Sequence, residues 1–135
     1  VRQAATTAVQ RYIKAMGELS TDGATTAAMD LIRAVDSYIE QTQPFKLAKD
    51  PANLPQVGSI LYNCAEAIRV ASVLLWPVIP GKVEALWQRL GLDYAAPLAN
   101  SGAGQFAQWT TWGLLQPGST FAHGDPLFPR YQAPK

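Results

Sequence analysis

The chain has 135 residues, of which 48% are hydrophobic and 16% are charged, so it can bury one core and is neither a disordered tail nor a polybasic arm. Eleven Lys and Arg side chains against ten Asp and Glu give a formal net charge of +1, which excludes strong electrostatic steering of nucleic acid by this chain alone. The single cysteine, Cys64, excludes an internal disulfide and a cysteine-rich zinc site.

Two amphipathic helices are predicted in the first part of the chain. The first covers about residues 3–19, and its apolar face consists of Val9, Tyr12, Ile13 and Met16. The residues after it break the helix, and any of the three polar ones can cap the next helix: Ser20, Thr21 and Asp22. The second helix covers about residues 25–42, with an apolar stripe at helical spacing: Ala28, Leu31, Ile32, Val35, Tyr38 and Ile39. Pro44 ends it, because the residue before a proline avoids the helical conformation.

The end of the second helix combines a proline, an aromatic ring and two lysines: Pro44, Phe45, Lys46 and Lys49. A fixed aromatic ring beside cationic side chains is one way in which proteins hold an unstacked base of single-stranded RNA. The same residues also fit a helix end with a core aromatic side chain tucked beneath it. This segment alone does not decide between the two interpretations.

A long apolar helix is predicted at about residues 55–76 and a shorter one at about residues 80–90. Pro55 is tolerated in the first turn of the long helix. Apolar residues recur at helical spacing along it and make it the central helix: Ile60, Leu61, Cys64, Ala67, Ile68, Ala71, Leu74 and Leu75. The shorter helix turns Val83, Leu86, Trp87 and Leu90 inward and ends at Gly91, a good left-handed cap.

Arg69 lies on the apolar central helix, where an unpaired charge would be costly. We therefore expect a structural ion pair, with Asp36 or another carboxylate of the bundle. A short helix at about residues 103–112 would bury Phe106 and Trp109, and an irregular tail follows at 113–135. His123 has no second histidine or cysteine nearby, so no metal site is expected. These elements predict an all-α fold, an antiparallel helix bundle.

No signal peptide opens the chain, and its longest apolar run, Val70 to Pro80, is too short to cross a bilayer. We therefore expect a cytoplasmic protein that binds neither membranes nor DNA. Val1 is not a natural initiator, and helix-like sequence begins at once, which is typical of a piece of a longer polypeptide.

Three separate blocks of the sequence resemble the anticodon-binding domain of the methionyl-tRNA synthetase family. The first is the tyrosine-bearing helix that leads into Pro44-Phe45 and Leu47-Ala48-Lys49. The second is AIRVASVLLWPVIP at residues 67–80, followed by Leu86-Trp87 and Leu90-Gly91-Leu92. The third is Trp112-Gly113-Leu114 with Pro126 to Arg130. The resemblance covers nearly the whole chain, and it implies the C-terminal helix bundle of a class I aminoacyl-tRNA synthetase.

The resemblance implies a role in recognising the CAU anticodon of tRNA for an ATP-dependent methionine–tRNA ligase. The family's catalytic domain, with its His-Ile-Gly-His-type and Lys-Met-Ser-Lys-Ser-type motifs, has no counterpart in this sequence. ATP and methionine would bind that domain, which is an expected partner, together with the tRNA anticodon loop. We accordingly expect no catalytic residue, metal or cofactor in this chain.

The family also implies which residues meet the RNA. Pro44 and Phe45 match positions that pack against the anticodon, although the family usually has tryptophan where this chain has Phe45. Lys46, Lys49 and Arg33 are candidates for phosphate contacts, while a lysine after a helix end is often merely solvated. The family's base-reading asparagine and arginine lie on a helix that would precede Val1. The competing interpretation, which the near-neutral charge favours, is a helical interaction module with no RNA role.

Overall fold

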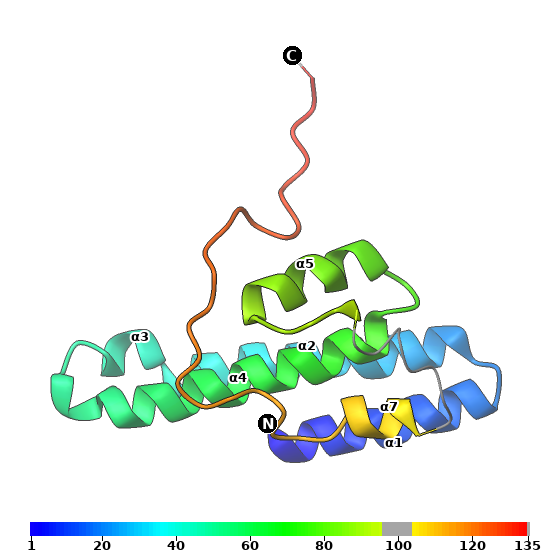
Figure 1. The fold of residues 1–135 in the computed structure, drawn as a ribbon, viewed down its shortest axis with the longest axis horizontal. Helices are drawn as coiled ribbons and strands as arrows, with labels where there is room; N and C mark the ends of the chain where they lie inside the picture. Colours follow the sequence, from blue (N-terminus) through cyan, green and yellow to red (C-terminus); the bar gives the residue numbers. More distant parts are fainter. Residues whose placement is uncertain (96–103, 135) are drawn as a thin grey trace.

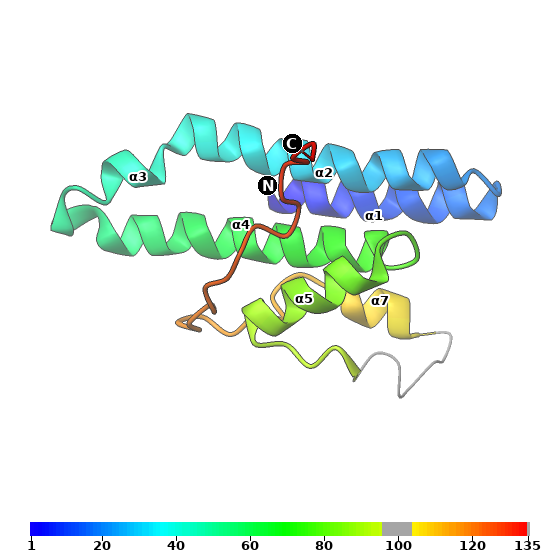
Figure 2. The same ribbon diagram turned by 90° about the horizontal axis from the view of Figure 1, so that it is seen from above.

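A computed structural model describes residues 1–95 and 104–134, and every element in them is helical. The helices are α1 (Arg2–Gly17), α2 (Thr21–Thr42), α3 (Pro44–Leu47), the 3₁₀ turn η1 (Pro51–Asn53), α4 (Leu54–Leu75), α5 (Pro80–Leu90) and α7 (Gln105–Trp109). The long helices α1, α2 and α4 lie side by side with successive directions reversed, and α5 and α7 cover α4 from one side (Figures 1 and 2). The predicted all-α antiparallel bundle with an irregular tail is confirmed.

Small residues form the contact between α1 and α2. Ala5 and Ala8 of α1 and Ala27 and Ala28 of α2 are at most 3% exposed, so the two helix backbones can approach closely. The predicted apolar face of α1 is partly wrong, because Tyr12 is buried but Ile13 and Met16 are 55% and 42% exposed. The large residues lie beside the contact with α2, where Ile13 and Met16 line an apolar groove together with Trp76, Phe106 and Trp109.

The predicted start of α2 is four residues too late, because the cap comes from the first of the three candidate residues. The hydroxyl of Ser20 accepts a hydrogen bond from the N–H of Gly23 at 3.3 Å. A Cβ atom at position 23 would lie only 2.7 Å from that hydroxyl oxygen, so the glycine permits the cap. In the sequence Gly23 suggested a break, whereas in the structure it is part of the first turn of α2.

The central helix α4 is buried along most of its length. By length and composition, the segment Pro51–Leu75 could cross a bilayer, but 67% of its apolar window is buried inside the bundle, as in the core helix of a soluble protein. Cys64 is buried, as predicted, and burial raises the pKa of its thiol. Leu61, expected to face inward, is 50% exposed, so that part of the prediction is wrong.

Helix α5 has the predicted bounds, and its indole side chain fastens it to α4. Trp87 is fully buried, and its Nε1–H donates to the Ser72 hydroxyl at 2.7 Å. That hydroxyl donates to the carbonyl oxygen of Arg69 at 2.5 Å. Gly91 ends the helix with φ of 71°, the left-handed cap expected from the sequence.

The expected ion pair of buried Arg69 is confirmed, and its partner is not Asp36 but the alternative, another carboxylate of the bundle. Arg69 pairs with Glu66, one turn earlier on the same helix, at 2.8 Å.

Helix α7 is shorter than predicted, and its Phe106 and Trp109 are only half-buried. Residue 103, the first of the predicted helix, lies outside the described residues.

The tail after α7 runs over α5 and then leaves the body of the molecule (Figure 1). The N–H of Ala122 donates to the carbonyl oxygen of Arg89 at 3.0 Å, and the Arg89 guanidinium donates to the carbonyl oxygen of Asp125. Lys82 lies 5.5 Å from the ring centre of Phe128, which is nevertheless 65% exposed.

Candidate nucleic-acid interface

The predicted RNA-contact residues begin at a sharp corner between α2 and α3. Helix α2 ends at Thr42, and Gln43 adopts the left-handed conformation with φ of 45° and ψ of 57°. Its N–H donates to the carbonyl oxygen of Ile39 at 2.8 Å, and its own carbonyl oxygen accepts the N–H of Lys46 at 2.9 Å. Pro44 opens α3, where its missing N–H costs nothing. The proline therefore ends α2 as predicted and also starts one further helical turn, which the sequence analysis missed.

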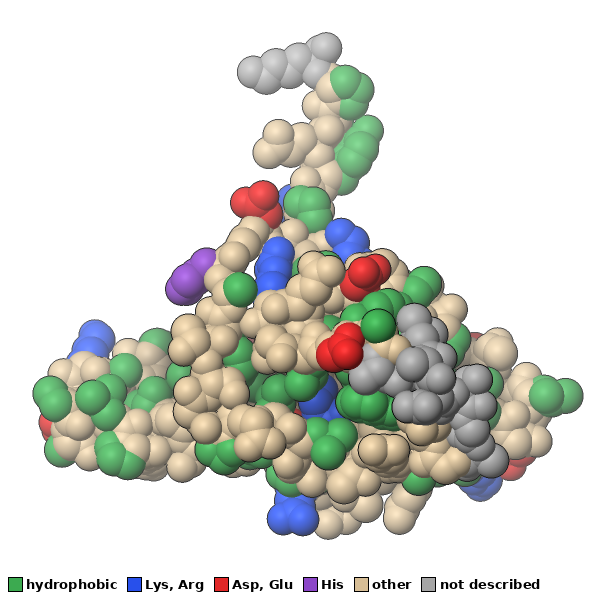
Figure 3. Space-filling model, in the orientation of Figure 1, with side chains coloured by type: hydrophobic (Ala, Val, Ile, Leu, Met, Phe, Trp, Pro, Cys, Tyr) green, Lys and Arg blue, Asp and Glu red, His purple; other side chains and the backbone are tan. Residues whose placement is uncertain are grey.

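This corner separates a buried residue from an exposed ring. Pro44 is buried and Leu47 half-buried beneath α3, whereas Phe45 is 61% exposed. The interpretation of Phe45 as a core aromatic is therefore wrong, since Pro44 and Leu47 fill that space. Helix α3, which carries this ring, lies at one end of the bundle (Figure 1), and the space-filling view shows apolar side chains and a basic one at that end (Figure 3). Such a ring is available for stacking.

Both neighbouring lysines are exposed beside the ring. Helix α3 ends at Leu47, and the N–H of Ala48 donates to the carbonyl oxygen of Pro44 at 2.9 Å. The N–H of Lys49 donates to the carbonyl oxygen of Lys46 at 3.2 Å, so Lys49 lies in the turn that follows α3. Lys46 follows Phe45 directly, and Lys49 comes four residues after it. Two cationic side chains therefore accompany the exposed ring.

The loop after α3 is held by its own side chains. The carboxylate of Asp50 accepts the N–H of Ala52 at 3.0 Å and caps η1. The side-chain amide of Asn53 donates to the carbonyl oxygen of Leu47 at 3.4 Å, which links the start of α4 to the end of α3. Neither Asn53 nor Gln43 was singled out from the sequence, and for Gln43 the only available signal was the proline that follows it.

The structure does not bring Arg33 to this corner. Arg33 lies about three turns back along α2, and it lines a groove with Thr25, Met29 and Val78 toward the opposite end of the bundle. Its guanidinium donates to one oxygen of Asp30 at 2.8 Å, and Arg11 donates to the other oxygen at 2.8 Å. The hydrogen bond from Arg11, followed by that from Arg33, lowers the pKa of the Asp30 carboxyl. We therefore separate Arg33 from the candidate interface of Pro44, Phe45 and Lys49.

The corner carries little net charge, because Glu40 and Asp50 accompany Lys46 and Lys49. A stacking ring accompanied by exposed lysines can hold an unpaired base and a neighbouring phosphate, without long-range attraction. Among residues 1–95 and 104–134, no three His, Cys, Asp or Glu side chains come together as metal ligands.

Comparison with known proteins places this helical chain in a larger family. No family model matches it. It is 38% identical over 118 residues to the methionine–tRNA ligase of Streptomyces coelicolor, an alignment that covers 85% of this chain and 21% of that protein. It is 37% identical over 128 residues to the corresponding ligase of Halalkalibacterium halodurans, covering 90% of this chain and 17% of the relative. The methionine–tRNA ligase of Bacillus subtilis is 33% identical over 125 residues, an alignment that covers 93% of this chain and 18% of that protein.

The chain thus spans about a fifth of the length of these relatives, and the alignments include the corner at Pro44-Phe45 within a match that takes in most of the chain. The resemblance stated from the three sequence blocks is confirmed by these identities. The chain belongs to the methionine–tRNA ligase family, in which it corresponds to one helical segment.

Proposed function

We propose that this segment recognises the CAU anticodon of tRNA on behalf of an ATP-dependent methionine–tRNA ligase. The observation that carries the proposal is the exposed ring of Phe45, which follows a buried proline and is accompanied by the exposed lysines Lys46 and Lys49. The membership of the family supports tRNA as the partner in general. The intact enzyme would act in the cytoplasm and would bind ATP and methionine in a catalytic domain outside this segment.

In this proposal an unstacked anticodon base lies on the face of Phe45, and Lys49 meets the neighbouring phosphate. Base–aromatic stacking contributes about 1–3 kcal/mol per base, and it does not by itself distinguish one base from another. Phenylalanine offers a smaller face than tryptophan and no N–H donor, so it supplies affinity rather than sequence reading. The base-reading groups would come from elsewhere in the intact enzyme.

The test is Phe45→Ala in the full-length ligase that contains this segment. We expect kcat/KM for tRNA charging to fall about 5- to 150-fold, which corresponds to one lost stack. Methionine-dependent ATP–pyrophosphate exchange should stay near the wild-type rate, because that reaction needs no tRNA. Phe128→Ala removes a ring of similar exposure, 65% against 61%, that lies on the tail, and it should not change the affinity for an anticodon stem–loop RNA. Equal charging by the Phe45→Ala variant and the wild type would refute the proposal.

The two lysines give an internal comparison. Lys49→Ala should weaken binding of the stem–loop and reduce the slope of log K against log salt by about 0.7, the value for one phosphate of a single strand. Lys46→Ala is the matched variant at the other exposed lysine, and a smaller change in both quantities would assign the phosphate contact to Lys49. If neither lysine variant, nor Phe45→Ala, changes RNA binding by the intact enzyme, the alternative of a helical interaction module without an RNA role is favoured.

A further inference from the structure

The central helix carries an ion pair that is completely removed from solvent. Glu66 and Arg69 are both 0% exposed. Arg69 donates to the two carboxylate oxygens through Nη2 at 2.8 Å and Nε at 3.1 Å, in a bidentate arrangement. The two residues are three positions apart on α4, so the helix itself holds them together.

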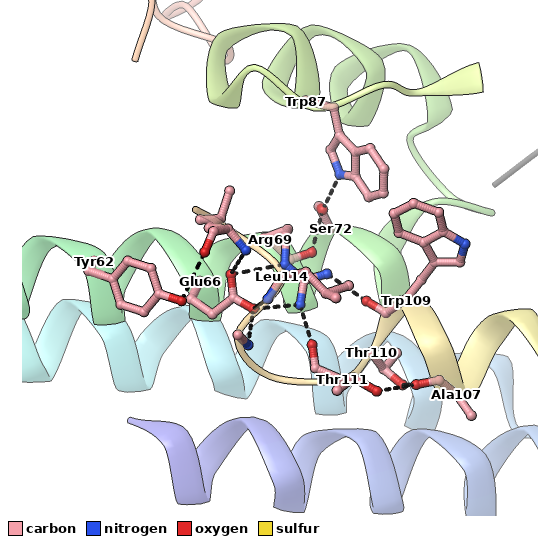
Figure 4. Close-up of polar contacts among 12 residues, drawn as sticks. Tyr62, Glu66, Arg69, Ser72, Trp87, Ala107, Trp109, Thr110, Thr111 and Leu114 are labelled. Atoms are coloured by element: carbon pink, nitrogen blue, oxygen red, sulfur yellow. Dashed lines mark hydrogen bonds and ion pairs between the residues drawn. The ribbon is translucent and has the colours of Figure 1, made fainter. Parts of the chain in front are cut away.

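The remaining hydrogen-bonding capacity of this pair goes to one short segment of backbone, residues 109–115, which we call the strap (Figure 4). The Glu66 carboxylate accepts three consecutive N–H groups, from Gly113 at 2.6 Å, Leu114 at 3.0 Å and Leu115 at 3.2 Å. Arg69 donates to two carbonyl oxygens, those of Trp109 and Thr111, at 2.6 Å each. Two side chains of α4 therefore hold five backbone groups of the strap.

Apart from this pair, side-chain packing on α4 and α5 holds α7 and the strap. Phe106 and Trp109 pack on the buried cluster of Val73, Val83 and Trp87, and the rings of Trp109 and Trp87 are 5.3 Å apart, so detachment would also uncover part of the Trp87 indole. Leu115 packs with Ala65 and Leu90. Helix α7 contains no buried residue, and within the strap only Leu115 is buried. Tyr62 adds one hydrogen bond, from its hydroxyl to the carbonyl oxygen of Leu115 at 3.1 Å. The main buried cluster is made by α1, α2 and α4, and residues of 104–112 meet it only at its edge, through Phe106 and Trp112. The three long helices can therefore keep their core when the strap leaves.

The placement of both charges on one helix makes such a departure reversible. If the strap leaves, Glu66 and Arg69 remain paired on α4, and water replaces the five backbone groups. No buried charge loses its partner, which is the costly outcome when an ion pair links two separate elements. The fully satisfied state is regained when the strap returns, because its N–H and carbonyl groups meet a receptor that has not moved.

We propose that α7 and the strap form a latch that detaches from α4 as one unit and closes again while α1, α2 and α4 stay folded. Opening uncovers Tyr12, because the ring of Phe106 stacks on it at 5.6 Å with an interplanar angle of 16°. It also widens the apolar groove of about 520 Å³ that α7 shares with α1 and the end of α4. Helix α3, which carries Phe45, lies at one end of the bundle and away from α7 (Figure 2), so it does not take part.

Hydrogen exchange measured by mass spectrometry on the full chain tests the latch. In the wild type, amides of residues 113–115 should exchange at least tenfold faster than buried α4 amides near Leu74, because they exchange through latch opening and not through global unfolding. Glu66→Gln should speed the exchange of 113–115 at least tenfold further, since a neutral amide replaces the charged acceptor. Exchange near Leu31 of α2 should not change.

Tyr62→Phe is the milder variant, and it carries the test if Glu66→Gln does not fold. It removes one hydrogen bond to the strap and should speed exchange of residues 113–115 about fivefold, the effect of one neutral hydrogen bond. The matched control is Tyr38→Phe, the same change at a half-buried tyrosine of α2, and it should leave the exchange of residues 113–115 unchanged. The proposal is overturned if strap and core amides exchange at one common rate in the wild type, or if the variants accelerate exchange near Leu31 as much as in the strap.

Discussion

The contact between Trp87 and Ser72 provides the sharpest prediction about stability. Trp87 is 0% and Ser72 4% exposed, and the indole N–H has the Ser72 hydroxyl as its acceptor at 2.7 Å. Ser72→Ala therefore leaves a buried donor without a partner, which costs about 1–3 kcal/mol. Alanine is the better helix former and returns about 0.5 kcal/mol. The net expected loss is about 0.5–2.5 kcal/mol, from a total stability of about 5–15 kcal/mol for a domain of this size.

The sign of the effect should depend on Trp87. In a Trp87→Phe background no indole N–H remains to be satisfied, so Ser72→Ala should be neutral or stabilising by about 0.5 kcal/mol, the helix-propensity gain alone. The difference between the two backgrounds is the coupling energy of the pair, about 1–3 kcal/mol. Trp87→Phe has its own cost from lost packing, and the cycle subtracts that cost.

Urea denaturation followed by circular dichroism at 222 nm measures all four proteins, because the helical signal does not depend on the tryptophan that is changed. The wild type, both single variants and the double variant should unfold with the same denaturant slope, so that midpoints report stability. If Ser72→Ala costs the same free energy with Trp87 and with Phe at that position, the hydrogen bond does not attach α5 to α4, and the reasoning fails.

Two further predictions concern backbone strain and acid. Gly91→Ala should lower the free energy of unfolding, measured by heat or urea, by about 1–2 kcal/mol, because an alanine is strained at φ of 71°. The space around the position is open, so backbone strain is the only penalty expected. An unchanged stability would contradict this. Burial alone would raise the pKa of Glu66, but Arg69 and the N–H groups of Leu114 and Gly113 lower it below the ordinary 4.5. The ionised carboxylate therefore adds to the free energy of unfolding above pH 4.5. This stabilisation is lost as the pH falls through the pKa that Glu66 has in the folded protein. Tryptophan fluorescence during acid titration should show this loss, and Glu66→Gln should not show it.

The helices were predictable from the sequence because their signals are local. The bounds of α4 and α5 follow from Pro55, Gly91 and helical periodicity, and they agree with the structure within a residue or so. Errors occur where a cap or a packing partner decides. Ser20, Thr21 and Asp22 are all competent caps, and only the close fit of Ser20 against Gly23 selects one. On α1 the largest apolar residues suggested the buried face, whereas the closest helix contact uses alanines.

The candidate interface, too, was predictable from the sequence only in part. The end of α2 at Pro44 is a property of the proline itself, so it was predictable, and so was the aromatic ring that follows. Which side of that ring faces water depends on the left-handed turn at Gln43, a non-glycine residue whose conformation has no signature of its own. The separation of Arg33 from the corner is a matter of distance along α2, and it could have been calculated from the rise of the helix.

Arg69 shows most clearly where sequence reasoning stops. Its place on an apolar helix correctly predicted burial and an ion pair, because an unpaired charge there would be too costly. Which carboxylate pairs with it was left open between Asp36 and another one of the bundle, and the structure selects Glu66. What buries Glu66 is a strap more than forty residues away in sequence, whose three N–H groups need a carboxylate. The i,i+3 spacing alone could not have shown this, because the same spacing forms an exposed pair between Asp30 and Arg33; what distinguishes Glu66 and Arg69 is the distant backbone segment that covers them.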